Sequence, residues 1–160
     1  MNQLSLFNHE CLHGVKWRLE IDGASRGNPG PSGAGIHILR EELEYLKRGY
    51  FLGTRTNNQA EYEALILGLC ILRTLIQEHD FIEIISDSEL LVRQISGRYD
   101  VKNSVLRQLH QRVRELLYGI KNSVAHVARA ENTVADALAN EGIDKRIMIP
   151  EDLKIQCALS

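Results

Sequence analysis

The sequence predicts a single domain of the α/β class, and three observations carry that prediction. Residues 15–21 alternate between apolar and polar side chains, which is the period of a half-buried strand. Residues 56–76 place apolar side chains three and four apart, as a helix does when one face packs on a core. Residues 81–86 form a nearly continuous apolar run, typical of a strand buried on both faces. Strands and helices that follow one another in this way predict a mixed α/β domain.

Composition limits the class of protein. The chain has 160 residues, of which 44% are hydrophobic and 25% charged, so it can bury the core of one globular domain. Its apolar runs are shorter than the roughly 20 residues that cross a bilayer, and the start lacks the features of a signal peptide. We therefore expect a cytoplasmic protein without a membrane partner. Cys11, Cys70 and Cys157 are odd in number and lack zinc-site spacing, which predicts free thiols.

The first strand is expected to end at Asp22. Three glycines, one proline and one asparagine lie between residues 23 and 30, which is too many turn formers for a ladder to continue. Residues 33–39 and 43–52 then read as two strands that complete an antiparallel meander. A phosphate-binding loop at 30–35 is rejected, because no Gly-Lys-Ser or Gly-Lys-Thr and no helix follows. We expect no nucleotide cofactor.

The second half of the chain alternates helices and strands. Residues 89–95 and most of 98–121 are predicted as helices, 122–127 as the last strand, and 131–144 as a helix capped near Asn132. The pattern fades beyond Gly142, so the domain is placed at 15–144 between tails at 1–14 and 145–160. The helix within 98–121 is rich in Lys and Arg, although the chain has a net charge of -2. That face suits either solvent or a phosphate backbone.

Four acidic residues share an unusual position. Asp22 and Asp87 each end a predicted strand, and Glu61 and Asp136 each head the inward stripe of a helix. Turn formation, helix capping or the helix dipole would explain any one of them alone. Together they would repel one another unless a cation compensated. Two hard divalent ions about 3.5 to 4 Å apart do so in phosphodiester cleavage, so the four predict a metal-dependent nuclease.

These residues resemble the type 1 ribonucleases H. The matching motifs run in family order from about residue 15 to 144: Asp22-Gly23-Ala24-Ser25, Gly27-Asn28-Pro29-Gly30, Thr56-Asn57-Asn58-Gln59-Ala60-Glu61, Ser86-Asp87-Ser88, Val101-Lys102-Asn103, and Glu131-Asn132 with Ala135-Asp136 and Leu138-Ala139. The resemblance implies a ribonuclease H-like fold. Its five-stranded mixed sheet joins a three-stranded antiparallel meander to two parallel strands, with helices on both faces.

The resemblance also implies the reaction, which is hydrolysis of the RNA strand of an RNA-DNA hybrid with two Mg²⁺ or Mn²⁺ ions. Asp22 would bridge the ions, Asp87 and Asp136 would hold one each, and Glu61 would also accept a hydrogen bond from a ribose 2′-hydroxyl, which separates RNA from DNA. The matched substrate contacts are Asn28, Asn57 and Asn58 in the minor groove, and Thr56 and Asn103 at a DNA-strand phosphate.

The sequence departs from the family pattern in two places. Many members carry a mobile histidine in a glycine-containing loop before the last aspartate, but here that loop is shortened to His126-Val127-Ala128-Arg129-Ala130. Strand alternation assigns His126 to the sheet, so Arg129 is the preferred candidate for that catalytic role. The basic handle of some members is missing between Ile95 and Val101. We expect the basic helix from Arg98, or binding to a sliding clamp, to compensate for it.

Two motifs lie in the N-terminal tail. Gln3-Leu4-Ser5-Leu6-Phe7 resembles the pentapeptide by which bacterial replication and repair proteins bind the sliding clamp. An extra edge strand or a packed arm is the alternative. The histidines of His9-Glu10-Cys11-Leu12-His13 have the spacing of zinc proteases, which requires a helix. Gly14 and the strand that follows it exclude that helix.

Two other functions remain as alternatives. A catalytically silent hybrid-binding module would be expected to have lost at least one of the four carboxylates, and all four are present. Integrases, transposases and junction resolvases have related carboxylate sites. Asn57-Asn58-Gln59 before Glu61, together with the loop at Asn28, favours hybrid recognition over these DNA nucleases.

Overall fold

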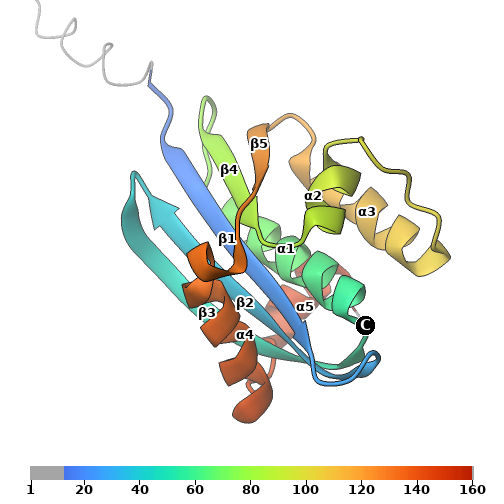
Figure 1. Ribbon diagram of the computed structural model, residues 1–160. Coiled ribbons are helices and arrows are strands. Elements are labelled where there is room, and N and C mark those ends of the chain that lie inside the picture. The colour runs from blue at the N-terminus through green and yellow to red at the C-terminus, as the bar shows by residue number, and fades with distance from the viewer. Residues whose placement is uncertain (1–12, 160) are drawn as a thin grey trace, which may run out of the picture.

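The computed structural model describes residues 13–159, and the clamp-like residues Gln3, Leu4, Leu6 and Phe7 lie outside them. Five strands form one sheet in the order β3-β2-β1-β4-β5 (Figure 1). Antiparallel pairs join β1 (Lys16–Ser25), β2 (Gly30–Arg40) and β3 (Leu43–Arg55). β4 (Phe81–Ser86) is parallel to β1, and β5 (Lys121–His126) is parallel to β4. The predicted mixed sheet, an antiparallel meander with two parallel strands, is confirmed.

Helices cover both faces of the sheet. The five are α1 (Asn57–Arg73), α2 (Glu89–Ile95), α3 (Ser104–Leu117), α4 (Thr133–Asp144) and α5 (Glu151–Cys157). α1 packs on β1 and β2 with α3 beside it, and α4 packs on β2 and β3 across the opposite face (Figure 1). Among residues 13–159, no helix is long and apolar enough to cross a membrane.

β1 continues beyond the residue at which it was predicted to end. Asp22 pairs with Gly35, and the ladder runs on to Ser25 opposite Ser32, so the turn shrinks to residues 26–29. The prediction was wrong because small residues on β2 let the hairpin extend through the glycine-rich segment. The pairing of β1 with β4 stops earlier, at Glu20 opposite Ile85. β1 therefore extends past β4, and Asp22 lies where the two strands part.

Gly35 allows α4 to lie directly on the sheet. A Cβ atom built on Gly35 would be 1.9 Å from the carbonyl oxygen of Ala135 in α4. We expect Gly35→Ala to lower the free energy of unfolding by about 3 kcal/mol, because the backbone of α4 would have to move. Urea unfolding measures this change. A loss below about 1 kcal/mol would show that the helix yields easily.

The sequence set two helix boundaries too wide. α1 ends at Arg73 rather than near residue 76, and α3 begins only at Ser104, where the side chain of Asn103 caps it. The segment 145–160, set apart as a tail, contains α5, which packs against α1 and buries Cys157. Cys70 and Cys157 are both free and buried, as predicted for these two thiols.

Candidate active site

Three of the four predicted acidic residues meet at the point where β1 and β4 part. Asp22, Glu61 and Asp87 each place one carboxylate oxygen within 4.8 Å of the others. Asp22 comes from β1, Asp87 directly follows β4, and Glu61 comes from the second turn of α1. Ser88 rather than Asp87 caps α2, since the Ser88 hydroxyl accepts from the Leu91 amide at 3.2 Å. Capping therefore does not explain Asp87.

Asp136 joins this group through Asp22. It lies in the first turn of α4, near enough to Asp22 that its negative charge helps to raise the pKa of Asp22. The guanidinium of Arg129, in the short turn before α4, lies 3.4 Å from Asp136 Oδ1. The structure thus gathers all four carboxyl groups at one edge of the sheet.

Burial and the neighbouring carboxylates favour the neutral form of Asp22 and Glu61 in the absence of a cation. Burial, with the charges of Asp87 and Asp136 adding to it, raises the pKa of Asp22 to about 8. Burial also raises the pKa of Glu61, again with help from the neighbouring acids, although the Gly23 amide donates to Glu61 Oε2 at 3.1 Å and opposes this shift. An all-oxygen set with excess negative charge fits a hard divalent ion such as Mg²⁺ or Mn²⁺.

Backbone contacts set the distance between Asp22 and Glu61. Gly23 lies against the first turns of α1, where an added Cβ would be 2.2 Å from both Ala60 C and Glu61 N. Only glycine lets β1 approach the helix so closely. The Asp22-Gly23 pair therefore does more than start a turn, because it brings strand and helix together.

Asn132 connects the strand that carries Asp22 to the helix that carries Asp136, a role that the sequence did not predict. It was predicted only as a helix cap, yet its side chain makes no capping bond. Its Nδ2 instead donates to the carbonyl of Ile21 at 2.9 Å, and its own carbonyl accepts from the Asp136 amide at 3.1 Å. The residue is 2% exposed. The Glu131-Asn132 motif was a signal, but only the fold shows that Asn132 ties α4 to β1 beside Asp22.

Four of the predicted substrate residues, Thr56, Asn57, Asn58 and Asn103, lie at helix starts, and Asn28 lies in the turn between β1 and β2. The Asn57 amide donates to Asn28 Oδ1 at 3.0 Å, so the 26–29 turn holds the beginning of α1, where Asn57 and Asn58 are exposed. The Thr56 hydroxyl accepts from the Gln59 amide at 3.2 Å as the α1 cap. Asn103 caps α3 by accepting from the Val105 amide at 2.9 Å. The structure joins Asn28 to Asn57 directly, whereas Asn103 comes from a different helix.

His126 and Arg129 both lie close to the acidic residues. His126 lies in the sheet, as predicted, and is the last residue of β5, one residue before the predicted end of that strand; its Nε2 lies 3.2 Å from the backbone carbonyl of Asp87. Arg129 reaches the Asp136 carboxylate, and its side chain is 81% exposed. Arg129 thus contacts an acidic side chain, whereas His126 contacts backbone.

Comparison with known proteins agrees with this arrangement. A family profile described as "Reverse transcriptase-like" matches residues 20–142. The ribonuclease HI of Halobacterium salinarum is 44% identical over 126 residues, which cover 78% of this chain and 62% of that protein. A ribonuclease H of Coxiella burnetii is 36% identical, and the match covers 79% of this chain and 89% of the relative.

Solved structures give the same result. The crystal structure of LC11-RNase H1 in complex with an RNA/DNA hybrid is 36% identical with a TM-score of 0.74, and the match covers 82% of this chain and 97% of that one. The residues matched by the family profile, 20–142, include all four carboxylates. The chain therefore belongs to the type 1 ribonuclease H family.

Proposed function

We propose that this protein is an endonuclease that hydrolyses the RNA strand of RNA-DNA hybrids with two divalent metal ions, Mg²⁺ or Mn²⁺. The observation that carries this proposal is the convergence of Asp22, Glu61 and Asp87 oxygens within 4.8 Å. A family member of 36% identity was crystallised with an RNA/DNA hybrid, which supports the choice of substrate. The metal and the hybrid are assigned to this chain on those grounds.

Each carboxylate is given a role that follows from its neighbours. Asp22 borders both Asp87 and Asp136, so it would bridge the two ions while each of the others holds one. When bound, such ions stabilise the attacking and leaving oxygens of phosphodiester hydrolysis. Glu61, held by the Gly23 amide, would accept a hydrogen bond from a ribose 2′-hydroxyl. That contact would select the RNA strand for cleavage.

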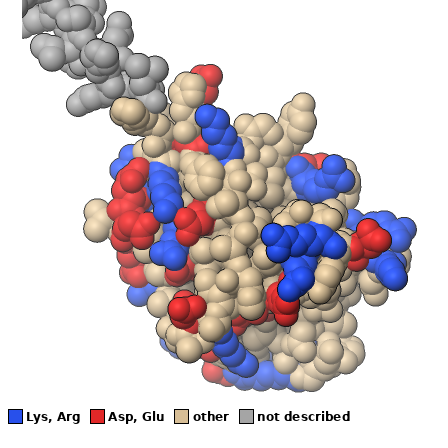
Figure 2. Space-filling model, turned by 45° about the horizontal axis from the view of Figure 1, so that its top comes forward, with Lys and Arg blue, Asp and Glu red and all other residues tan. Residues whose placement is uncertain are grey.

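The surface around the site offers contacts for a duplex. Exposed amides of Asn28, Asn57 and Asn58 suit hydrogen bonding in a minor groove, and Thr56 with Asn103 suits a phosphate of the DNA strand. Lys and Arg side chains are prominent on the part of the surface that α2 and α3 cover, with some Asp and Glu side chains beside them (Figure 2). This basic face would compensate for the missing handle.

Cleavage assays with labelled hybrid, duplex DNA and duplex RNA test the proposal. We expect the wild-type protein to cut only the RNA strand of the hybrid, and only with Mg²⁺ or Mn²⁺ present. Hybrid binding without cleavage would indicate a silent module, and cleavage of branched or duplex DNA would indicate a resolvase-like enzyme. Either result would overturn the proposed reaction.

Arg129 is proposed to assist turnover in place of the loop histidine of other members. Its guanidinium lies beside Asp136 and is exposed enough to move with substrate or product. We expect Arg129→Ala to lower kcat by about tenfold and His126→Ala by less. Steady-state kinetics on one hybrid rank the two variants, and the reverse order would assign the role to His126.

Recruitment by a sliding clamp is proposed from residues 3–7 alone. Two leucines and a phenylalanine in such a short segment suit an apolar pocket on a partner. A clamp pull-down should lose the protein when Leu6 and Phe7 are both replaced by alanine. Unchanged capture would favour the edge strand or packed arm. We propose that the nuclease acts in the cytoplasm.

A further inference from the structure

We propose that Arg107 is a positioning residue that shapes the segment 98–103, hereafter the strap, so that Lys102 and Asn103 face the DNA strand. The strap joins α2 to α3 at the place where other family members insert a basic handle. The inference rests on the proposed function, because it assigns to Arg107 a part in binding the hybrid. On this inference, not every arginine of α3 contacts a phosphate.

Side chains hold three consecutive carbonyl groups of the strap. The Asp100 carbonyl accepts from Gln94 Nε2 at 3.4 Å. The next two accept from one guanidinium, since Arg107 Nε donates to Val101 at 3.2 Å and Arg107 Nη2 donates to Lys102 at 3.3 Å. A planar guanidinium presents its donors in a fixed geometry that suits two successive carbonyls, whereas a lysine ammonium is a point charge on a flexible stem and is not preorganised for them. Arg107 therefore fixes the backbone immediately before Asn103.

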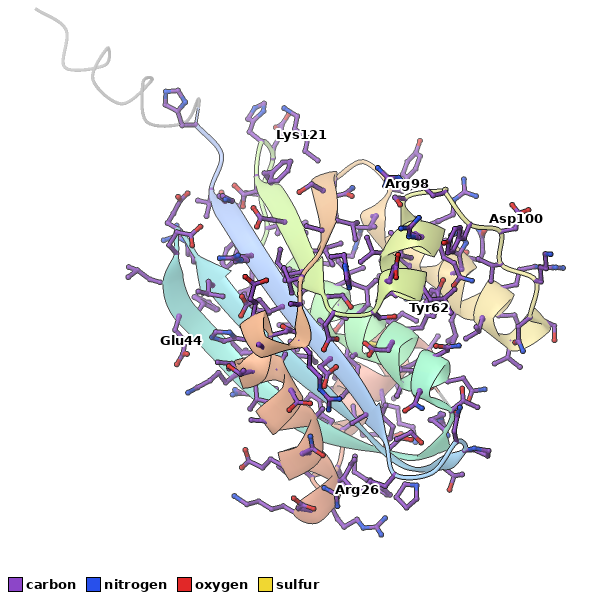
Figure 3. The ribbon with its side chains drawn as sticks, viewed as in Figure 1. Arg26, Glu44, Tyr62, Arg98, Asp100 and Lys121 are labelled. Carbon is purple, nitrogen blue, oxygen red and sulfur yellow. The ribbon has the colours of Figure 1, made fainter. Side chains whose placement is uncertain are left out.

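The other anchor of the strap leads back to α1. Gln94 is 5% exposed, and its Oε1 accepts from the Tyr62 hydroxyl at 2.7 Å. Tyr62 is 1% exposed and follows Glu61 directly in the chain. Figure 3 labels Tyr62 on α1 and Asp100 in the strap, the two residues that Gln94 connects. The strap is thus tied to the same helix that carries a metal-binding carboxylate of the proposed site.

The start of the strap is fixed as well. The amides of Arg98 and Tyr99 both donate to the Arg93 carbonyl, at 2.8 and 3.1 Å. The Arg93 guanidinium also lies 5.1 Å from the centre of the Tyr99 ring. With both ends and three carbonyls held, a segment without regular structure presents Lys102 and Asn103 in one arrangement.

The basic residues near α3 divide into two groups. Arg107 binds strap carbonyls, and Arg112 donates to the carbonyls of Gln156 and Cys157 in α5. The side chains of Lys102 and Arg114, by contrast, make no ion pair or hydrogen bond with any residue between 13 and 159, and the same holds for Arg98 in the strap. These three side chains are free to meet a phosphate. Arg107 contributes through the shape of the strap.

The experiment is a double-mutant cycle read as KM and kcat for one hybrid at fixed salt. Arg107→Ala is combined with Asn103→Ser, which keeps a good helix cap and removes the amide. We expect Arg107→Ala to raise KM about fivefold at unchanged kcat, and the double variant to match Asn103→Ser alone, because coupled residues are not additive. Arg107→Lys should behave like Arg107→Ala. Arg114→Ala, which also removes one positive charge from α3, is the control for a loss of charge alone.

The outcomes separate this inference from the function on which it rests. If the two KM effects multiply, or if Arg107→Lys restores the wild-type KM, Arg107 acts by charge and the inference is overturned while the enzyme assignment stands. If the wild-type protein neither binds nor cuts the hybrid, the proposed function and the inference fall together. Thermal unfolding of each variant checks that a raised KM does not come from unfolded protein.

Discussion

Asp22→Asn is expected to abolish cleavage and at the same time to stabilise the metal-free protein at pH 8 by about 2 kcal/mol. Activity is lost because Asp22 borders the other acids and would bridge the two ions, so we expect kcat to fall at least about 1000-fold. Stability is gained because asparagine fills the same space without charge. Few substitutions at a buried polar residue would be expected to stabilise a fold, which makes the sign of this effect informative.

The pH dependence of stability follows from the direction of the Asp22 shift. Burial raises the pKa of Asp22 from an ordinary 3.8 to about 8. Below about pH 4 this carboxyl is protonated in both the folded and the unfolded protein, so its ionisation does not lower the free energy of unfolding. Between about pH 4 and pH 8 the Asp22 carboxyl is ionised in the unfolded chain but stays protonated in the folded protein. The free energy of unfolding of the wild type therefore falls as the pH rises across that range. Urea unfolding in EDTA at pH 5 and pH 8 should show this fall, reduced in Asp22→Asn. An equal pH dependence in both proteins would contradict the account.

Asp80→Asn is the matched control, because Asp80 is a buried carboxylate at the opposite end of β1. Burial alone would raise its pKa, but three donors outweigh burial and hold the pKa below its usual value. They are Trp17 Nε1 at 2.9 Å, the Val15 amide at 2.8 Å and the Gln77 amide at 3.0 Å. We expect this variant to lose about 2 kcal/mol of stability and to keep its kcat.

Asn132→Asp is expected to have the second largest effect, because it removes the donor that ties α4 to β1 and adds a negative charge. Asn132 Nδ2 donates to the Ile21 carbonyl at 2.9 Å, and a carboxylate oxygen in that place would repel it. We expect a loss of about 3 kcal/mol in unfolding free energy. Since Asp136 would no longer be held beside Asp22, kcat should fall about 100-fold.

Asn140→Asp provides the comparison for Asn132→Asp. It makes the same change of side chain one turn beyond Asp136 on α4, where Asn140 Nδ2 donates to the Asp136 carbonyl at 3.0 Å and Asn140 Oδ1 accepts from Arg26 Nη2 at 3.3 Å. Unlike Asn132, Asn140 is only half-buried, so an aspartate in its place can turn toward Arg26 and form an ion pair. We expect its stability to stay within about 1 kcal/mol of wild type and its kcat to be unaffected. If Asn132→Asp behaves like Asn140→Asp, Asn132 does not position the site.

The sequence predicts where the acidic residues of the candidate site lie, because the order of the strands largely fixes their positions. Once β1 and β4 are adjacent and parallel, the residues that follow the end of their pairing must lie together, and Asp22 and Asp87 do. Glu61 and Asp136 follow from the helical spacing of the residues behind them. The end of β1 was mispredicted for a local reason, since Gly23, which was counted as a turn former, also suits a ladder against which a helix packs closely.

Other features depend on contacts between distant segments and could not be read from a pattern. Asn132 looks like a cap in the sequence, and only the approach of α4 to Ile21 shows its other partner. The strap has no periodicity, so its order comes from Gln94 and Arg107 rather than from its own residues. α5 is too short to be predicted with assurance from its own seven residues, and its burial of Cys157 depends on α1.

The most direct test of the central claim is the shift in unfolding temperature when Mg²⁺ is added to metal-free protein at pH 8, compared between wild type and Asp22→Asn. A ligand that binds only the folded state raises that temperature in a saturable way. The account predicts a saturable rise for the wild type and little or none for the variant, whose metal-free value starts higher. Equal rises in the two proteins, or none in the wild type, would show that the four carboxylates do not form a cation site.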